Sequence, residues 1–216
     1  FNFISSPDVA QLCSKFIYGK CRNQRATLLY FGKYKSQLNS FQEEVLRHAA
    51  EQIKTLSYTV KRMRWEEVSD WRNQLLGYEG QVAHCYWQAL ILANLLPDSF
   101  QGREKRNAND VVNQSLNYGY AILTSYVWHC LINAGLEVYA GCLHTERAGK
   151  PSLVLDLMEE YRAWTVDRVV IKLRSQLEGS SELTPVFKKK IVTDIHETFY
   201  RKYSYKNRKL RLESIL

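Results

Sequence analysis

Apolar residues recur every three or four positions along most of this chain, which is the spacing of amphipathic helices. The first helix begins at Ser6-Pro7-Asp8, an N-cap followed by proline at the first helical position, and runs to about Tyr30 before Gly32 ends it. The same periodicity predicts further helices over residues 36–58, 60–76, 79–96, 110–134 and 152–177, and from Thr184-Pro185 onward.

Glycine, proline and polar residues separate these helices. Gly77 is expected to stop or kink the chain between two of them, and the polar segment 97–109 has no apolar periodicity and is predicted as a loop. No pair of strands is evident, and the basic tail from Arg201 is expected to fray. The pattern therefore predicts an all-α, multi-helix fold.

The composition agrees with a globular protein. Of 216 residues, 45% are apolar and 24% are charged, which is enough for one large domain or two small ones. No run approaches the roughly 18 apolar residues of a membrane span, so no membrane association is expected. The five cysteines are irregularly spaced and form no CxxC pair, which favours free thiols in a cytosolic protein over disulfides or structural zinc.

Charge is unevenly distributed along the chain. The formal net charge is +8, yet residues 1–42 contain six basic residues and one acid, and residues 184–216 contain nine basic residues and three acids. The segment between them is mildly acidic. Basic surface attracts polyanions, and gathered acids suit a hard divalent cation. This combination is typical of a metal-dependent enzyme acting on nucleic acid, although basic residues that only solvate helix faces would produce the same total.

Three acids share one face of a helix predicted in the C-terminal half. Asp156, Glu159 and Glu160 are spaced i, i+3 and i+4, with apolar residues around them. Carboxylates at a packed boundary are costly unless they are paired, and a metal ion would compensate their charge. A solvated acidic face with Arg162 and Arg168 as ion-pair partners is the simpler interpretation.

Two further side chains could join these acids. His144 precedes their helix on a loop, from which its imidazole could reach the same point; a solvent-exposed or capping role is the alternative. Glu79 stands between Gly77 and Gly80, in what is predicted to be the first turn of a helix. That position suits an anion, so a simple partner of the helix dipole is the alternative there.

Four blocks of residues stand in order along nearly the whole chain. They are Lys20-Cys-Arg-Asn-Gln-Arg25, Tyr78-Glu-Gly80 with Tyr86, Asp110-Val-Val-Asn113-Gln-Ser-Leu-Asn117-Tyr-Gly-Tyr120, and Gly141-Cys-Leu-His144 followed by Ser152-Leu-Val-Leu-Asp156-Leu-Met-Glu-Glu160. Together they resemble the C-terminal catalytic domain of the CRISPR-associated integrase family, the Cas1 proteins. The resemblance implies a helical catalytic domain over residues 1–216, with a core at 1–183 and a basic C-terminal helix and tail at 184–216.

The resemblance also implies a Mg²⁺ or Mn²⁺ ion held by the catalytic residues Glu79, His144 and Glu159. Asp156 matches a further acid of the family and is expected to bind the metal directly or through water. Two carboxylates and one imidazole, with positions open to water and phosphate, suit these cations better than structural zinc.

By the same resemblance, the chain is expected to integrate spacer DNA into a CRISPR array and to have nuclease activity. A DNA 3′-OH attacks a phosphodiester of the repeat, and the metal stabilises the charge that develops on the phosphate. The implied partners are DNA (spacer ends and CRISPR repeat), the Cas2 protein and a second copy of the chain, in the cytoplasm of a prokaryote.

Two more groups of residues are candidates for supporting roles. Asn113, Asn117, Tyr118 and Tyr120 are expected to support the site. The two asparagines share a helix face and are expected to hydrogen-bond the loop that holds His144, whereas helix packing is the simpler role for the tyrosines. Contacts to DNA phosphates are expected from Arg22, Arg25, Arg103, Lys105 and Arg106.

The chain departs from the family at its beginning. Family members normally carry an N-terminal β-rich domain that mediates dimerisation, and these 216 residues do not contain it. We therefore take the chain as a piece of a longer protein or of a fusion; some members are fused to a reverse transcriptase, and no polymerase motif occurs here. The alternative function is a non-catalytic helical module of a larger fusion that binds nucleic acid or a partner protein without a metal.

Overall fold

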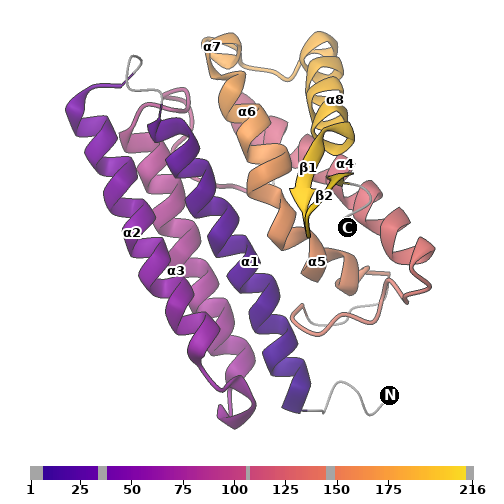
Figure 1. Ribbon diagram of the computed structural model, residues 1–216. Coiled ribbons are helices and arrows are strands. Elements are labelled where there is room, and N and C mark those ends of the chain that lie inside the picture. The colour runs from indigo at the N-terminus through magenta and orange to yellow at the C-terminus, as the bar shows by residue number, and fades with distance from the viewer. Residues whose placement is uncertain (1–6, 34–37, 106–107, 145–148, 213–216) are drawn as a thin grey trace.

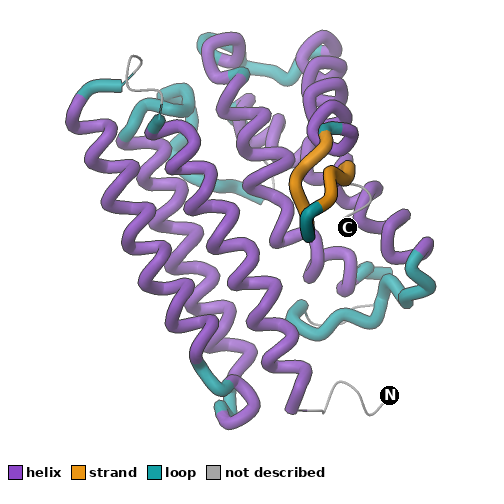
Figure 2. The backbone as a smooth tube through the Cα atoms, in the orientation of Figure 1, coloured by secondary structure: helices purple, strands orange, loops and turns teal. Residues whose placement is uncertain are grey.

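The computed structural model describes residues 7–33, 38–105, 108–144 and 149–212, which are mostly helical (Figures 1 and 2). None of the helices in these ranges is long and apolar enough to cross a membrane. The elements are α1 (Pro7–Gly32), α2 (Ser40–Arg62), the 3₁₀ turn η3 (Trp65–Glu67), α3 (Trp71–Leu92), α4 (Val111–Asn133), α5 (Ser152–Arg162), the π-helical turn η4 (Ala163–Asp167), α6 (Arg168–Lys172), α7 (Arg174–Leu177), α8 (Pro185–Tyr200), β1 (Lys202–Tyr205) and β2 (Arg208–Arg211).

The first group of helices consists of α1, α2 and α3, which lie side by side (Figure 1). A capping box begins α2: Asn39 Oδ1 accepts the backbone N–H of Gln42, and Gln42 Oε1 accepts that of Asn39, both at 2.9 Å. Ile17, Ile53 and Leu90 contribute fully buried side chains from the three helices. Burial of these apolar stripes stabilises the helices more than local propensity does.

The predicted break at Gly77 is wrong, because α3 continues through it. A Cβ at Gly77 would meet no atom within 4 Å, so the glycine is not required by a turn or a close approach. A glycine inside a helix costs only about 1 kcal/mol relative to alanine, and the buried stripe of α3 offsets that cost. The predicted helix 60–76 is replaced by the end of α2, η3 and the start of α3. Glu79 therefore lies within a long helix, and its assignment to a first turn is also wrong.

The second group consists of α4 to α8, with α5, η4 and α6 following one another without a loop. Asp110 caps α4, accepting the N–H of Asn113 at 2.8 Å, and Thr184 caps α8 ahead of Pro185, where the sequence predicts that helix to begin. The π-helical turn η4 shifts the helical register directly after α5. Such turns are frequent at functional sites. The predicted all-α fold is confirmed for the helices.

A small hairpin replaces the frayed tail that the sequence analysis predicted. β1 and β2 are antiparallel, with Lys202 opposite Arg211 and Tyr205 opposite Arg208. The two turn residues, Lys206 and Asn207, have φ of 45° and 63°. Two central residues with positive φ give the turn whose twist matches a two-residue hairpin, and asparagine tolerates that conformation well. The two strands are orange in Figure 2, and the turn between them is teal.

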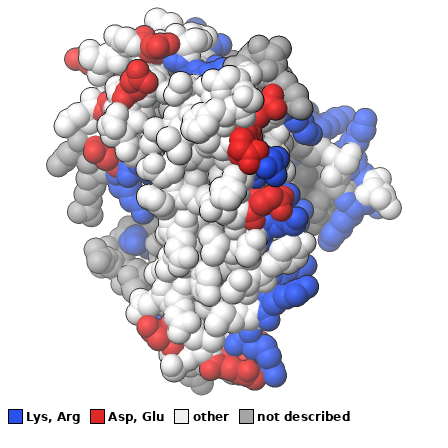
Figure 3. Space-filling model, turned by 90° about the vertical axis from the view of Figure 1, so that its left-hand side faces the viewer, with Lys and Arg blue, Asp and Glu red and all other residues white. Residues whose placement is uncertain are grey.

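The outer face of the first group carries mixed charge. Figure 3 turns this side of the molecule toward the viewer and shows acidic and basic side chains along its edges, with an uncharged band between them. Ion pairs along α2, Arg47 with Glu44 and Lys54 with Glu51, account for part of this pattern. The face turned toward the viewer is therefore mixed in charge, with many of its basic side chains along the right-hand edge of the view.

α1 is the helix of the first group that faces the second group. It packs against α2 and α3, and also against α5 and η4 (Figure 1). Two polar residues, Lys20 and Gln24, occupy its buried stripe and are 7% and 3% exposed. Their burial places polar groups at the junction of α1, α3 and α5.

Candidate functional site

Lys20 lies between two carboxylates from distant parts of the chain. Its Nζ donates to Glu159 Oε2 on α5 at 2.6 Å and also to Glu79 Oε1 on α3. Burial lowers the pKa of Lys20, but the charges of Glu159 and Glu79 together outweigh burial and hold this pKa above its ordinary value. The centre of the junction is therefore a buried ammonium group held by two carboxylates.

Glu159 is surrounded by cationic groups and an imidazole. Arg162 Nη1 lies 3.0 Å from Glu159 Oε1, and His144 Nε2 lies 4.0 Å from the same oxygen. Burial raises the pKa of Glu159, but Lys20 and Arg162 outweigh burial and lower the pKa to about 2. Glu159 is consequently ionised at neutral pH, with oxygens that face positive charge.

Asp156, one turn earlier on α5, is fully buried and has a different set of partners. Its Oδ2 accepts the backbone N–H groups of Cys142 and Leu143 at 2.6 and 2.9 Å, and its Oδ1 accepts that of His144 at 2.9 Å. His144 Nδ1 lies 2.7 Å from the same Oδ1, where it donates to the carboxylate. Asp156 thus fixes both the backbone and the ring of His144, and it leaves Nε2 as the nitrogen facing Glu159.

The donor set at this junction suits a hard divalent cation. Glu79 and Glu159 supply carboxylate oxygens, His144 supplies Nε2, and the Lys20 ammonium already stands between the two carboxylates as a cation would. Among the described residues, no three His, Cys, Asp or Glu side chains converge closely enough to enclose a metal. Metal binding by these residues stays a prediction.

Asn113 and Asn117 hold a different loop from the predicted one. Arg103 Nη1 donates to Asn113 Oδ1 at 2.8 Å, and Arg103 Nη2 donates to Asn117 Oδ1 at 2.6 Å. The predicted hydrogen bonds from these asparagines to the His144 loop are therefore wrong. Asp156 holds that loop instead, while α4 turns its two amides toward the segment that follows α3.

The two tyrosines of the same block point to different places. Tyr120 donates from its hydroxyl to Asp167 Oδ1 at 2.6 Å, and the guanidinium carbons of Arg103 and Arg162 lie 5.2 and 4.9 Å from its ring centroid. Tyr118 instead packs against the core beside a lysine of α8. Tyr120 therefore contacts the arginines next to the site, whereas Tyr118 has the packing role.

The basic residues predicted to contact DNA are scattered. Arg22 is exposed on α1. Arg25 instead contacts α2, where its Nη2 lies 3.2 Å from Glu51 Oε1. Lys105 is exposed beside a cavity that also reaches Lys20, and Arg106 lies outside the described residues. Their contacts to DNA stay predictions.

Glu160 of the predicted acidic face, and Arg168 as its expected ion-pair partner, have other neighbours. The Glu160 side chain lies against Gly19 of α1, where burial raises its pKa. The Arg168 guanidinium stacks on the ring of Trp164, with 3.9 Å between its carbon and the ring centroid. The ion pair that the solvated-face interpretation predicted for Arg162 is present. Asp156 and Glu159 are nevertheless buried, so the interpretation of the face as solvated is wrong for these two acids.

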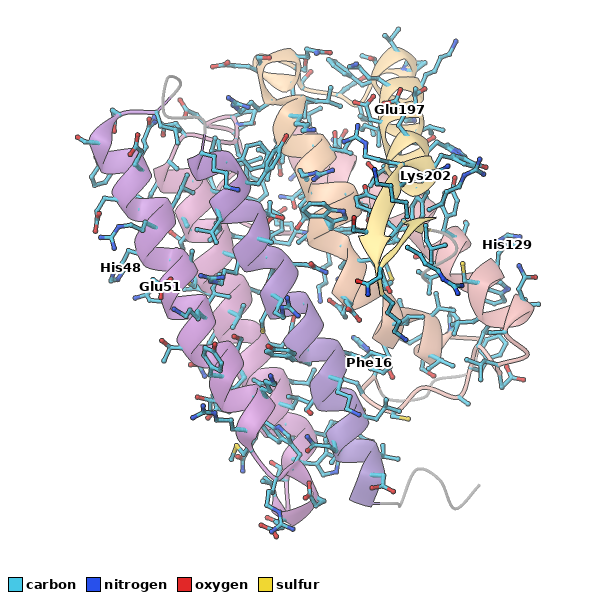
Figure 4. All side chains as sticks on the ribbon, in the orientation of Figure 1. Phe16, His48, Glu51, His129, Glu197 and Lys202 are labelled. Atoms are coloured by element: carbon cyan, nitrogen blue, oxygen red, sulfur yellow. The ribbon has the colours of Figure 1, made fainter. Side chains whose placement is uncertain are left out.

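Sequence reasoning gave no role to Lys20, Gln24 or Asp167. A signal for the first two was present, because both fall on the apolar stripe of α1 in register with Cys13 and Ile17. Polar residues at such positions are costly unless they are paired, and they often mark a site. His48 on α2 and His129 on α4, both labelled in Figure 4, are exposed, whereas His84 of α3 lines a cavity together with Lys20 and Glu79.

Residues 3–183 match the family model described as CRISPR associated protein Cas1. The chain is 44% identical over 205 residues to CRISPR-associated endonuclease Cas1 1 of Francisella tularensis subsp. novicida (strain U112), with 95% of this chain and 61% of that protein covered. It is 33% identical over 223 residues to CRISPR-associated endonuclease Cas1 1 of Archaeoglobus fulgidus, with 95% and 64% covered. The chain thus spans about three-fifths of the length of these relatives.

Solved structures have a similar fold. A CAS1 protein from Thermotoga maritima superposes with a TM-score of 0.73 at 19% identity, with 96% of this chain and 61% of that chain covered. A chain of a partial Cas6-RT-Cas1–Cas2 complex gives 0.76 at 23% identity, with 99% and 64% covered. A casposase bound to its integration product gives 0.72 at 22% identity, with 98% and 59% covered. The helical fold and the match over residues 3–183 lead to one conclusion: this chain belongs to the CRISPR-associated Cas1 family.

Proposed function

We propose that this chain is the helical catalytic part of a DNA integrase of CRISPR adaptation, which joins spacer 3′-OH ends to the CRISPR repeat with Mg²⁺ or Mn²⁺. The observation that carries the proposal is the meeting of Glu79 and Glu159 at the Lys20 ammonium, with His144 Nε2 4.0 Å from the other oxygen of Glu159. A buried cation between two carboxylates supports a divalent-cation site, because the metal has the same sign of charge and prefers the same oxygen ligands.

The chain's own residues hold and orient the reacting groups in this proposal. Glu79, Glu159 and Nε2 of His144 are the ligands, and Asp156 keeps the imidazole in the required tautomer through Nδ1. A bound divalent cation would stabilise the charge on the attacked phosphate. Arg162 adds a fixed positive charge beside Glu159. The attacking group is a DNA 3′-OH, so the protein supplies no covalent nucleophile.

The proposed partners are spacer and repeat DNA, Cas2, a second copy of the chain and an associated reverse transcriptase, in the prokaryotic cytoplasm. The net charge of +8 and the basic segments at both ends support a polyanionic ligand. Two relatives are named as endonucleases, and chains of similar fold occur in a Cas6-RT-Cas1–Cas2 complex and in a casposase bound to an integration product.

Strand transfer on a branched DNA substrate with Mn²⁺ tests the proposal. We expect Glu79→Gln to lower the rate about 100-fold or more, because it removes a charged ligand. Glu160→Gln is the matched control, since its side chain lies against Gly19, and it should keep nearly wild-type activity. EDTA should abolish transfer by the wild type.

Two results would count against the assignment. One is equal activity of Glu79→Gln and Glu160→Gln, and the other is transfer that persists in EDTA. Salt-dependent DNA binding without any Mn²⁺-dependent transfer, even with Cas2 added, would favour the non-catalytic binding module instead.

A further inference from the structure

Arg72 lies in the first turn of α3 and reaches the loop that precedes α5. Its Nε and Nη2 both donate to the backbone carbonyl of Cys142, at 3.2 and 2.9 Å. A carbonyl oxygen has two lone pairs, and the planar guanidinium presents two donors to it at once. Arg72 belongs to none of the ion pairs among the described residues. The arginine is therefore bound to the loop by hydrogen bonds and not by a carboxylate.

Helix stability does not explain an arginine at this position. The first turn of a helix carries the positive end of the helix dipole, so a cation there is unfavourable. The first turn of α3 contains no acidic residue that would compensate this charge. The guanidinium carbon lies 5.0 Å from the ring centroid of Trp71, which helps to fix the side chain. The contact with the loop is thus the feature that requires an explanation.

One peptide group of this loop joins two helices. The carbonyl of Cys142 accepts from Arg72, and the N–H of Leu143 in the same peptide group donates to Asp156 Oδ2 at 2.9 Å. C=O and N–H point in opposite directions in a planar trans peptide, so this group lies between α3 and α5. Cys142 and Leu143 are 5% and 1% exposed, and the exclusion of water strengthens hydrogen bonds. His144 is the next residue, so its backbone position depends on both anchors.

The two anchors fix the loop relative to different candidate ligands. Asp156 is three residues before Glu159 on α5. Arg72 is seven residues before Glu79 on α3, which places these two side chains on one face of the helix, about 10 Å apart along its axis. α3 and α5 both pack on α1. Arg72 is therefore a direct link between the helix of Glu79 and the loop of His144.

We propose that Arg72 is a positioning residue, which sets the distance between Glu79 and His144 by joining α3 to the carbonyl of Cys142. This role rests on the proposed function, in which those two residues bind the same divalent cation. Asp156 orients the imidazole relative to α5, and Arg72 places the whole loop relative to α3.

The first measurement is the affinity of the full chain for Mn²⁺ by calorimetry. Arg72→Met should weaken binding about tenfold or more, as the loss of a group that orients a metal ligand does. Loss of the positive charge alone would strengthen cation binding, so the expected change has the opposite sign from a charge effect. Arg64→Met, at an exposed arginine just before α3, is the matched control and should leave the affinity unchanged. An affinity of Arg72→Met equal to or above that of the wild type would overturn the proposal.

Arg72→Lys separates the geometry of the side chain from its charge. Lysine keeps the positive charge but does not present the two fixed donors of the guanidinium. This variant should therefore also bind Mn²⁺ more weakly than the wild type. Wild-type affinity in Arg72→Lys would overturn the role of the paired hydrogen bonds.

A double-mutant cycle with Glu79→Ala tests whether Arg72 acts through that ligand. If Arg72 sets the distance from His144 to Glu79, its substitution loses its effect once the carboxylate of Glu79 is removed. Arg72→Met should therefore change the Mn²⁺ affinity by less than about twofold in a Glu79→Ala chain, against about tenfold in the wild type. An equal loss in both backgrounds would overturn the proposal.

Hydrogen exchange in EDTA supplies a readout without metal and guards against a folding artefact. The N–H groups of Leu143 and His144 donate to Asp156 and should exchange several-fold faster in Arg72→Met, whereas that of Ile53, in the core of α2, should not change. Unchanged exchange in the loop, or equally faster exchange at all three groups, would count against a local hold by Arg72 and overturn the proposal.

These measurements need no DNA, so they separate the positioning role from strand transfer. Mn²⁺ affinity that depends on Arg72 and Glu79, in a chain without strand transfer even with Cas2 added, would support the positioning role and contradict the proposed function. Strand transfer that depends on Glu79 but is unchanged in Arg72→Met would do the reverse. A wild-type chain that binds no Mn²⁺ would overturn both.

Discussion

Asp156 and Glu159 lie one turn apart on α5, and both are buried, yet their surroundings differ in kind. Asp156 accepts three backbone N–H groups and the ring of His144, all from one short loop. Glu159 faces two side-chain cations, Lys20 from α1 and Arg162 from α5 itself. Backbone partners cannot leave without unfolding the loop, whereas a side-chain cation can be exchanged for another cation.

The type of partner, and not burial alone, therefore distinguishes a structural acid from one that can bind a cation. Asp156 is expected to govern stability and the orientation of His144, while Glu159 is expected to govern cation binding. Substitutions on either side of this division test it.

Asp156→Ala should have the largest effect on stability. It leaves three buried N–H groups of the loop without an acceptor, which we expect to cost about 3 to 5 kcal/mol of unfolding free energy. Urea denaturation measures the loss. Glu160→Ala, on the same helix but only half-buried, is the control and should cost far less. A mild effect of Asp156→Ala would mean that the loop is held by other contacts and that the two acids are more alike than their partners indicate.

Gly141→Ala should produce the next largest effect. A Cβ at Gly141 would lie 2.4 Å from the backbone carbonyl carbon of Ser152, so this loop could not approach the start of α5 closely enough for Asp156 to reach it. We expect a loss of about 1 to 3 kcal/mol by denaturation.

Gly77→Ala supplies the opposite control for that substitution. A Cβ there meets nothing within 4 Å inside α3, so the protein should gain about 0.5 to 1 kcal/mol. Destabilisation by Gly77→Ala, or stability of Gly141→Ala equal to that of the wild type, would contradict the described packing.

Lys20→Met tests the side-chain cation of Glu159, and apart from the Gly77→Ala control it has the smallest expected effect, here on the free energy of Mn²⁺ binding. It removes the ammonium that competes with Mn²⁺ for Glu79 and Glu159. The affinity for Mn²⁺, measured by calorimetry, should therefore rise about tenfold, a gain of about 1.4 kcal/mol in binding free energy. Lys54→Met, at an exposed pair on α2, is the matched control and should leave the affinity unchanged. Weaker Mn²⁺ binding in Lys20→Met would show that the lysine supports the metal and does not compete with it.

Much of the fold could be predicted because its signals are local. Apolar periodicity located most helices, and the caps at Asp110 and Thr184 lie where their side chains predict. The errors came from treating local signals as decisive. Gly77 did not end a helix, because a cost of about 1 kcal/mol is small beside the burial of the α3 stripe. The hairpin after α8 was missed, although Lys206-Asn207 between short alternating segments is a turn signal.

The candidate ligands could be named from ordered blocks of residues, but their partners could not. Lys20 and Glu159 are 139 positions apart, and no spacing rule links them. Asn113 and Asn117 were correctly placed on one helix face, yet they bond Arg103 and not the loop of His144. A helix face can be read from periodicity, whereas the element that packs against it depends on the whole chain.

Local sequence was thus sufficient for the helices, their caps and the resemblance to the Cas1 family. Packing of α1 between α3 and α5 chose which carboxylate receives an ammonium and which receives backbone N–H groups. The physical reason is the range of the forces involved. Helix periodicity and capping act over a few residues, whereas ion pairs and buried hydrogen bonds form only after distant segments have excluded water together.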